Sequence, residues 1–211
     1  MTRTCWSLRL GSNIGLLQSF PVGSVHSLEL FPLGFEEFLM GHENPRLLEA
    51  YRGRSREHIE HGLLWSALLD HCFVGGMPAA VERWFDRSSR LRERVRTVTT
   101  IHRDFVRGYA RDFGKYAGKL HAQHIDAVWR NVPRQLGRNQ DGSVRRFRFK
   151  SVIPRKRGNQ DLAGPIEWLH SGKLIRRGFP VRGRPRAPLM AHVRHNMFRL
   201  YFFDTVCSDT R

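Results

Sequence analysis

Ten basic residues between positions 145 and 177 are the side chains of this sequence best suited to bind phosphate. Arginine can form two parallel hydrogen bonds with a phosphate and can stack on a nucleobase, and lysine adds a compact positive charge. Their grouping in one part of the chain predicts contact with nucleic acid, DNA above all. The candidate DNA-binding residues are Arg145, Arg146, Arg148, Lys150, Arg155, Lys156, Arg157, Lys173, Arg176 and Arg177.

The positive charge is unevenly distributed along the chain. The 211 residues include 36 Lys and Arg against 19 Asp and Glu, which gives a net charge of +17. Residues 1–130 hold 18 basic and 14 acidic residues, whereas residues 131–211 hold 18 and 5. Arginine outnumbers lysine 31 to 5. A GC-rich genome would produce that bias too, but it would not produce the clustering. We therefore expect an anionic partner, with nucleic acid first and an acidic surface second.

Metal binding and acid–base catalysis have much weaker signals. Glu36 and Glu37 are adjacent, so on a helix they point in different directions and do not form a catalytic pair. The three cysteines are far apart, which argues against a disulfide framework and a cysteine zinc site. Three His-x-x-His pairs lack any evident third ligand, so we expect no metal. These pairs are His58/His61, His121/His124 and His192/His195.

The length and hydropathy restrict the protein to a few classes. A chain of this size forms one mid-sized domain or two small ones. It has no run of 18 apolar residues and no apolar stretch typical of a signal peptide near its first residue. We therefore expect a cytoplasmic protein with no membrane partner. No small-molecule substrate is evident from the sequence.

The elements that would position the basic residues are mostly helices, so the expected fold is mainly α with short β strands. Apolar residues at helical spacing, bounded by Gly and Pro, indicate the helices, and alternation indicates the strands. Ser55 and either Ser88 or Ser89 are expected N-caps, Gly114 and Gly118 expected stops, and Cys72 an expected core residue. Helices are expected at 34–40, 45–52, 55–72, 78–85, about 90–114, 120–136 and 161–170, strands at 25–31, 144–150 and 198–204, and a small hairpin from 174–175 and 179–181.

Several ordered segments together resemble a bacterial and archaeal family of AAA-type ATPases that carry a C-terminal domain of unknown function. The resemblance covers nearly the whole chain. It implies an edge of the ATPase core at 1–40, a helical region at 41–100 and an incomplete C-terminal domain at 101–211, with a winged-helix-like part at about 140–187 and an incomplete nuclease-like end. The matching segments are residues 19–25, 30–39, 74–78, 109–116, 161–169, 188–189 and 198–205.

The sequence departs from that family where the family's catalytic motifs would lie. In the intact family ATP and Mg are bound by Walker A and Walker B motifs, and this chain has neither. The resemblance assigns Ser12 and Asn13 to the polar tip that senses the nucleotide. No (D/E)-x-K triplet occurs, although nuclease chemistry of that type requires one. We therefore expect no catalytic residue and no cofactor in this chain.

Three functions follow from these observations. The first is a non-catalytic fragment of an AAA-type ATPase that contacts DNA or an intact ATPase subunit. The second is a standalone basic winged-helix protein that binds DNA. The third is an active ATPase subunit, which the absence of the Walker motifs argues against. The alternative to DNA contact is that the winged-helix-like part is only a spacer that packs domains. DNA binding predicts an affinity that falls steeply with salt. A chain that only contacts an ATPase subunit predicts little affinity for DNA at physiological salt and co-purification with a larger ATPase.

Overall fold

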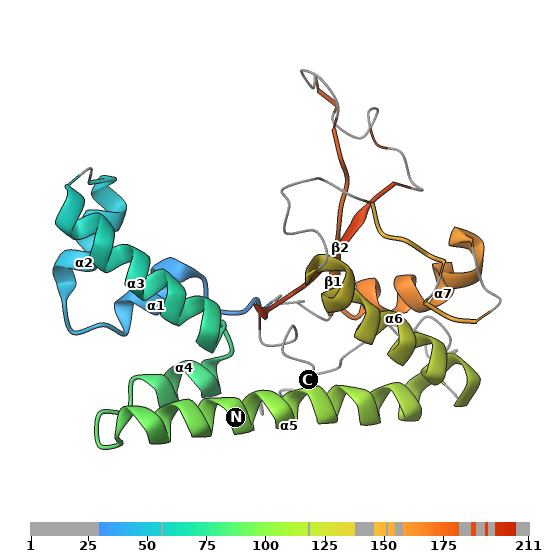
Figure 1. Cartoon of the computed structure of the whole chain (residues 1–211), viewed down its shortest axis with the longest axis horizontal. Helices are drawn as coiled ribbons and strands as arrows, with labels where there is room; N and C mark the ends of the chain where they lie inside the picture. The colour runs from blue at the N-terminus through green and yellow to red at the C-terminus, as the bar shows by residue number, and fades with distance from the viewer. Residues whose placement is uncertain are drawn as a thin grey trace, which may run out of the picture. The chain divides into compact units, whose positions relative to one another are not determined.

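The computed structural model of this chain describes residues 30–55, 57–117, 119–137, 146–150, 152–154, 158–181, 187–188, 193 and 197–205 (Figure 1). These residues form seven helices and one two-stranded antiparallel sheet, so the expectation of a mainly helical fold with short strands is confirmed. They divide into two compact units. The helical unit comprises the described residues of 29–112 together with Asp204 and Thr205, and the basic unit comprises those of 113–203. The domain boundaries expected at residues 40 and 100 stay predictions.

The helical unit begins with short helices whose ends follow local signals. Helix α1 (Phe35–Met40) begins after Gly34, whose amide donates to Glu37 Oε2 at 2.8 Å, and it ends at Gly41. In α2 (Pro45–Gly53) the Asn44 side chain accepts from the amide of Arg46 at 3.2 Å. Both arrangements satisfy amides that a first helical turn leaves without a partner. These two helices were expected from the Gly and Pro positions.

Helix α3 (His58–Val74) packs against α1, α2 and α4 (Pro78–Trp84). The N-cap of α3 is Glu57 and not the expected Ser55, although Ser55 Oγ accepts from the amide of Glu57 at 3.2 Å. Gly75 ends the helix with φ of 73°, a left-handed conformation that favours glycine. Cys72 is exposed, so its expected place in the core is wrong. The helix presents it outward, away from buried Ala67 and Val74.

Helix α5 (Leu91–Ala117) contributes residues to both units, since the division falls between Asp112 and Phe113. It begins after Arg90, whose carbonyl accepts the first helical hydrogen bonds, so neither Ser88 nor Ser89 is its N-cap. It also continues through Gly114, where we expected a stop. The expected core stripe is confirmed at Val98, which is buried among residues of α1, α3 and α4.

In the basic unit, α6 (Lys119–Gly137) and α7 (Asn159–Ser171) pack against each other and support the sheet (Figure 1). Strand β1 (Ile175–Gly178) pairs with β2 (Arg199–Phe202), and Ile175 lies opposite Phe202. The expected hairpin from 174–175 and 179–181 is therefore wrong, because the partner of β1 comes some twenty residues later. These four elements contribute to the core of this unit the buried side chains of Ile125, Val128, Trp129, Val132, Leu162, Ile166, Leu169, Ile175 and Leu200.

Two further expectations concern strands. Residues 146–149 are irregular and Lys150 lies in a turn, so the strand expected at 144–150 is wrong in its described part. Leu30 and Phe31 are in neither helix nor strand, and residues 25–29 of the strand expected at 25–31 lie outside the described residues. The strand expected at 198–204 is confirmed in the shorter form of β2.

Candidate nucleic-acid interface

The segment 146–150 presents three of the predicted DNA-binding residues to solvent. Its residues alternate, with Phe147 buried and Phe149 half-buried, while Arg146, Arg148 and Lys150 are exposed. Among the described residues, no carboxylate pairs with the side chains of these three cations. They are therefore available to an anionic ligand.

Two sets of hydrogen bonds fix the backbone of this irregular segment. The amide of Phe147 donates to the carbonyl of Phe198 at 2.7 Å. The side-chain amide of Gln135, on α6, bonds both sides of the Arg148 backbone: its Nε2 donates to the carbonyl at 2.9 Å, and its Oε1 accepts from the amide at 2.8 Å. Gln135 thus supplies the pairing that a neighbouring strand would supply, so no regular ladder is needed to hold the arginines outward.

Aromatic rings anchor the segment from below. The ring of Phe149 meets that of Phe198 edge-on at a centroid distance of 5.8 Å, and Phe147 and Phe149 meet edge-on at 5.5 Å. Phe179 adds a further edge contact with Phe198 at 6.0 Å. Burial of such rings is the main source of stability in small cores. The exposed arginines are therefore carried on a packed apolar base.

The outer face of the sheet carries a second group of polar residues. In an antiparallel pair, residues directly opposite each other share a face, so Arg176 lies on the same face as Tyr201, and Gly178 on the same face as Arg199. The ring of Tyr201 covers Gly178, since a Cβ on that glycine would lie 2.7 Å from Tyr201 Cε2. Arg176 and Tyr201 are both exposed. This face combines cations with a ring on which a base can stack.

The other predicted cations of the unit have different surroundings. Lys173 is exposed in the turn between α7 and β1, with φ of 60°. Arg177 is only half-exposed, and its guanidinium bonds Glu167 and lies 5.7 Å from the ring of Phe198. The hydrogen bond from Arg177 holds the pKa of the Glu167 carboxyl below its ordinary value. Arg177 is therefore engaged within the protein, unlike the arginines at 146 and 148.

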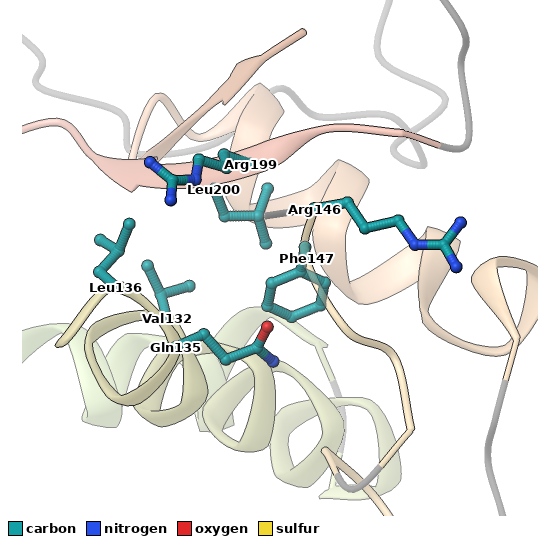
Figure 2. Close-up of a pocket in the computed structure, with 7 residues that line it drawn as sticks. All are labelled: Val132, Gln135, Leu136, Arg146, Phe147, Arg199 and Leu200. Atoms are coloured by element: carbon teal, nitrogen blue, oxygen red, sulfur yellow. The ribbon is translucent and has the colours of Figure 1, made fainter. Parts of the chain in front are cut away.

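A shallow hollow that is open to solvent lies between α6 and β2 (Figure 2). The guanidinium groups of its two cations, Arg146 and Arg199, point away from each other. They do not converge on one small anion. The enclosed volume of the hollow is about 10 Å³, far below the ~300 Å³ at which pockets for drug-sized ligands begin. Its lining is Val132, Gln135, Leu136, Arg146, Phe147, Arg199 and Leu200.

The remaining candidate residues can be placed in part. The expected nucleotide-sensing residues Ser12 and Asn13 lie outside the described residues, as do Arg145, Arg155, Lys156 and Arg157. Of the sites missed by sequence reasoning, Arg199 and Tyr201 had a usable signal. The alternation in 198–204 places them on one face, but that strand was interpreted as wholly buried.

The described part of the chain contains neither a metal-binding cluster nor a membrane-spanning helix. No group of three or more His, Cys, Asp or Glu side chains there could hold a metal ion. No helix there is both long and apolar enough to span a membrane.

The net charge differs strongly between the two units. Residues 29–112 hold 13 arginines and 13 acidic residues, so that stretch is neutral. Residues 113–203 hold 20 basic residues and 4 acidic ones. The basic unit therefore carries nearly all the positive charge, and the potential of its surface favours anions at a distance as well as in contact.

Fold and site together define a mainly helical protein of two units, in which a basic two-stranded sheet and an adjoining arginine-bearing segment form a positively charged surface. The chain belongs to the family described as a domain of unknown function, DUF8612, which it matches over residues 66–206. That match includes α4 to α7, both strands and all the described cations discussed above. No curated protein and no solved structure matches the chain.

Proposed function

We propose that this chain is a non-catalytic module that binds nucleic acid, with DNA as its first ligand, through phosphate contacts. The observation that carries this proposal is the outward presentation of Arg146, Arg148 and Lys150 from a fixed backbone, with no described carboxylate beside them. Arg176 and Arg199 extend the same charge onto the outer face of the sheet. We call these five residues the basic surface.

The arrangement favours a polyanion over a small anion. The guanidinium groups of Arg146 and Arg199 border one hollow but point apart, so no single phosphate can satisfy both (Figure 2). Cations spaced over an extended surface suit a ligand that carries one charge at each of many regular positions. Such contacts position a protein on the backbone and do not read sequence. The expected binding is therefore largely independent of sequence.

The resemblance to AAA-type ATPases supports a second candidate, in which the chain is a fragment or partner of such an ATPase and contacts an intact subunit. Two of the matching segments, 74–78 and 198–205, are far apart in the sequence but meet in the helical unit, where the Gly76 amide donates to Asp204 Oδ2 at 2.9 Å. Co-purification with a larger ATPase, together with weak DNA binding, would favour this candidate.

A salt titration tests the proposal. Fluorescence anisotropy of a labelled duplex is measured with the full chain between about 0.05 and 0.2 M NaCl. The affinity should fall with a log–log slope of about −0.9 for each phosphate neutralised. Two duplexes of unrelated sequence should bind within a few fold of each other. Absence of binding at the lowest salt, or binding that does not change with salt, would refute the proposal.

A further inference from the structure

Helix α3 exposes a row of large apolar side chains, although the ring of Phe73 also contacts the rings of Trp84 and His102. Ile59 is 80% exposed and Trp65 is 56% exposed, and three more residues of the helix are close to half exposed. A helix that is apolar on all sides is normally buried on all sides. In α3 only the opposite side is buried, through Ala67 and Val74. The exposed residues are Ile59, Leu63, Trp65, Leu69 and Phe73, which we call the α3 face.

The α3 face is large for an isolated protein surface. A large aromatic ring can bury ~150–250 Å² and an aliphatic side chain somewhat less. Because the five residues of the α3 face are only partly exposed, together they present on the order of 500 Å² of apolar surface. The largest apolar patch on a typical monomer is ~300–600 Å² and often marks an interaction site. The area alone therefore indicates a partner.

The charge of the helical unit narrows the choice of partner. Residues 29–112 carry equal numbers of basic and acidic residues, so their surface does not repel a second copy of itself. Most of the net charge of +17 lies in the basic unit. Two copies can therefore associate through the helical unit without repulsion between like net charges. An anionic partner, in contrast, would find no excess of cations in this unit.

Four of the five positions of the α3 face, all except Trp65, are symmetric about Ser66. Ile59 and Phe73 each lie seven residues from Ser66, and Leu63 and Leu69 each lie three residues from it. Spacings of three, four and seven residues keep side chains on one helical face. Two antiparallel copies of such a helix, centred on Ser66, would bring Ile59 of one copy against Phe73 of the other. The small side chain of Ser66 would face its own copy at the centre.

We propose that the α3 face is the interface of a homodimer in which the two α3 helices pack antiparallel about Ser66. A two-fold axis uses the same surface on both copies, and the α3 face is self-complementary in this sense. The pair would bury about 1,000 Å² from the apolar side chains alone, which is the lower limit for a specific interface. This proposal does not depend on nucleic-acid binding.

The test is the mass of the full chain in solution. Sedimentation of nuclease-treated protein in about 0.5 M NaCl removes association through nucleic acid, which salt disrupts, and leaves apolar contacts. Wild-type protein should sediment as a dimer of the 24.6 kDa chain. Leu69→Glu places two carboxylates in the seam and should weaken the dimer about tenfold or more. A monomer at tens of micromolar wild-type chain would overturn the proposal.

A matched control separates this interface from a general effect of charge. Leu91, at the start of α5, is 56% exposed against 54% for Leu69, and Leu91→Glu makes the same chemical change in the same unit. Leu91→Glu should remain dimeric. Circular dichroism checks that both variants fold. Equal dimerisation of the two variants, whether both dimeric or both monomeric, would overturn the assignment to the α3 face.

A cross-link tests the antiparallel pairing itself. In a background with the native cysteines replaced by serine, Ser66→Cys should form a disulfide-linked dimer on mild oxidation, because the two copies of residue 66 face each other. Leu91→Cys in the same background should not form it. A dimer that persists without the Ser66→Cys cross-link would refute the proposed pairing.

Discussion

The amide of Gly76 donates a hydrogen bond of 2.9 Å to the carboxylate of Asp204, 128 residues later in the chain. Both residues belong to the helical unit, and Asp204 is buried. The hydroxyl of Thr205 donates to the other carboxylate oxygen at 3.2 Å. Asp204 was expected only as the end of a buried strand. In the structure it ties the residues after β2 to the loop between α3 and α4.

Replacing Asp204 should therefore destabilise the protein. Asp204→Ala leaves the buried Gly76 amide without its acceptor, which costs about 1–3 kcal/mol of unfolding free energy. Asp204→Asn keeps one acceptor oxygen and should cost less than Asp204→Ala. Urea unfolding followed by circular dichroism gives both values. If the two variants are equally stable, the hydrogen bond is not the reason that Asp204 matters.

Two glycines should respond to alanine in opposite ways. A Cβ on Gly76 would lie 2.4 Å from the carbonyl oxygen of Leu33, which is backbone and cannot rotate away, so Gly76→Ala should be strongly destabilising. A Cβ on Gly108 would meet nothing within 4 Å in the middle of α5. Gly108→Ala should stabilise the protein by about 0.5–1 kcal/mol through helix propensity. Thermal unfolding distinguishes the two, and a loss at Gly108 would contradict the structure there.

The basic surface should be separable from net charge by a matched pair of triple variants. In the first, Arg146, Arg148 and Lys150 are replaced by glutamine, and the slope of log affinity against log salt should become shallower by up to about 2.7. In the second, three exposed arginines of α5 in the neutral stretch are replaced, and the slope should not change. These controls are Arg92, Arg96 and Arg103. Equal effects of both variants would mean that only net charge matters.

Stability should fall on mild acidification because of His42. Burial against the rings of Phe38 and Phe85 lowers the pKa of His42, and Arg87 lowers it further, although Asp70 opposes this effect. Since the folded-state pKa is below the unfolded value of about 6.5, the unfolded state takes up the proton first. The contribution of His42 is complete above that pH and is lost as pH falls below it. Burial raises the pKa of Asp70, which has the opposite sign and acts at lower pH.

The measurement compares urea midpoints at about pH 7.5 and 5.5. The decrease in urea midpoint from pH 7.5 to pH 5.5 should be smaller in His42→Phe than in wild type. This variant keeps an aromatic ring between Phe38 and Phe85. His121→Phe, at an exposed position of α6, should leave the drop unchanged. An undiminished drop in His42→Phe would assign the pH dependence to other groups.

Most helices could be predicted from the sequence because their ends depend on neighbouring residues. Gly41, Pro45, Pro78 and Gly172 terminate or begin helices through local backbone geometry. Gly114 failed as a stop because the packing of Phe113 against Trp129, at a centroid distance of 5.7 Å, outweighs the modest cost of one glycine in a long helix.

The strand pairing and the exposed face of α3 could not be predicted in this way. The partner of Ile175 is Phe202, and no local signal specifies a register across such a separation. The helical spacing of Ile59 and Leu63 places them on an apolar side of the helix, but it does not show whether a neighbouring element covers that side. The basic segment was predicted from charge alone, whereas its fixation by Gln135 depends on a contact from α6.

The long sequence separation of the Gly76–Asp204 hydrogen bond also has a consequence for synthesis on the ribosome. Translation proceeds at about 5–20 residues per second, so Asp204 is made roughly 6 to 26 s after Gly76. During that interval α1 to α4 can form, but the buried amide of Gly76 has no carboxylate to meet. The nascent helical unit therefore exists for seconds without this hydrogen bond and with the α3 face exposed. During that period a chaperone or a neighbouring nascent chain on the same polysome could bind it.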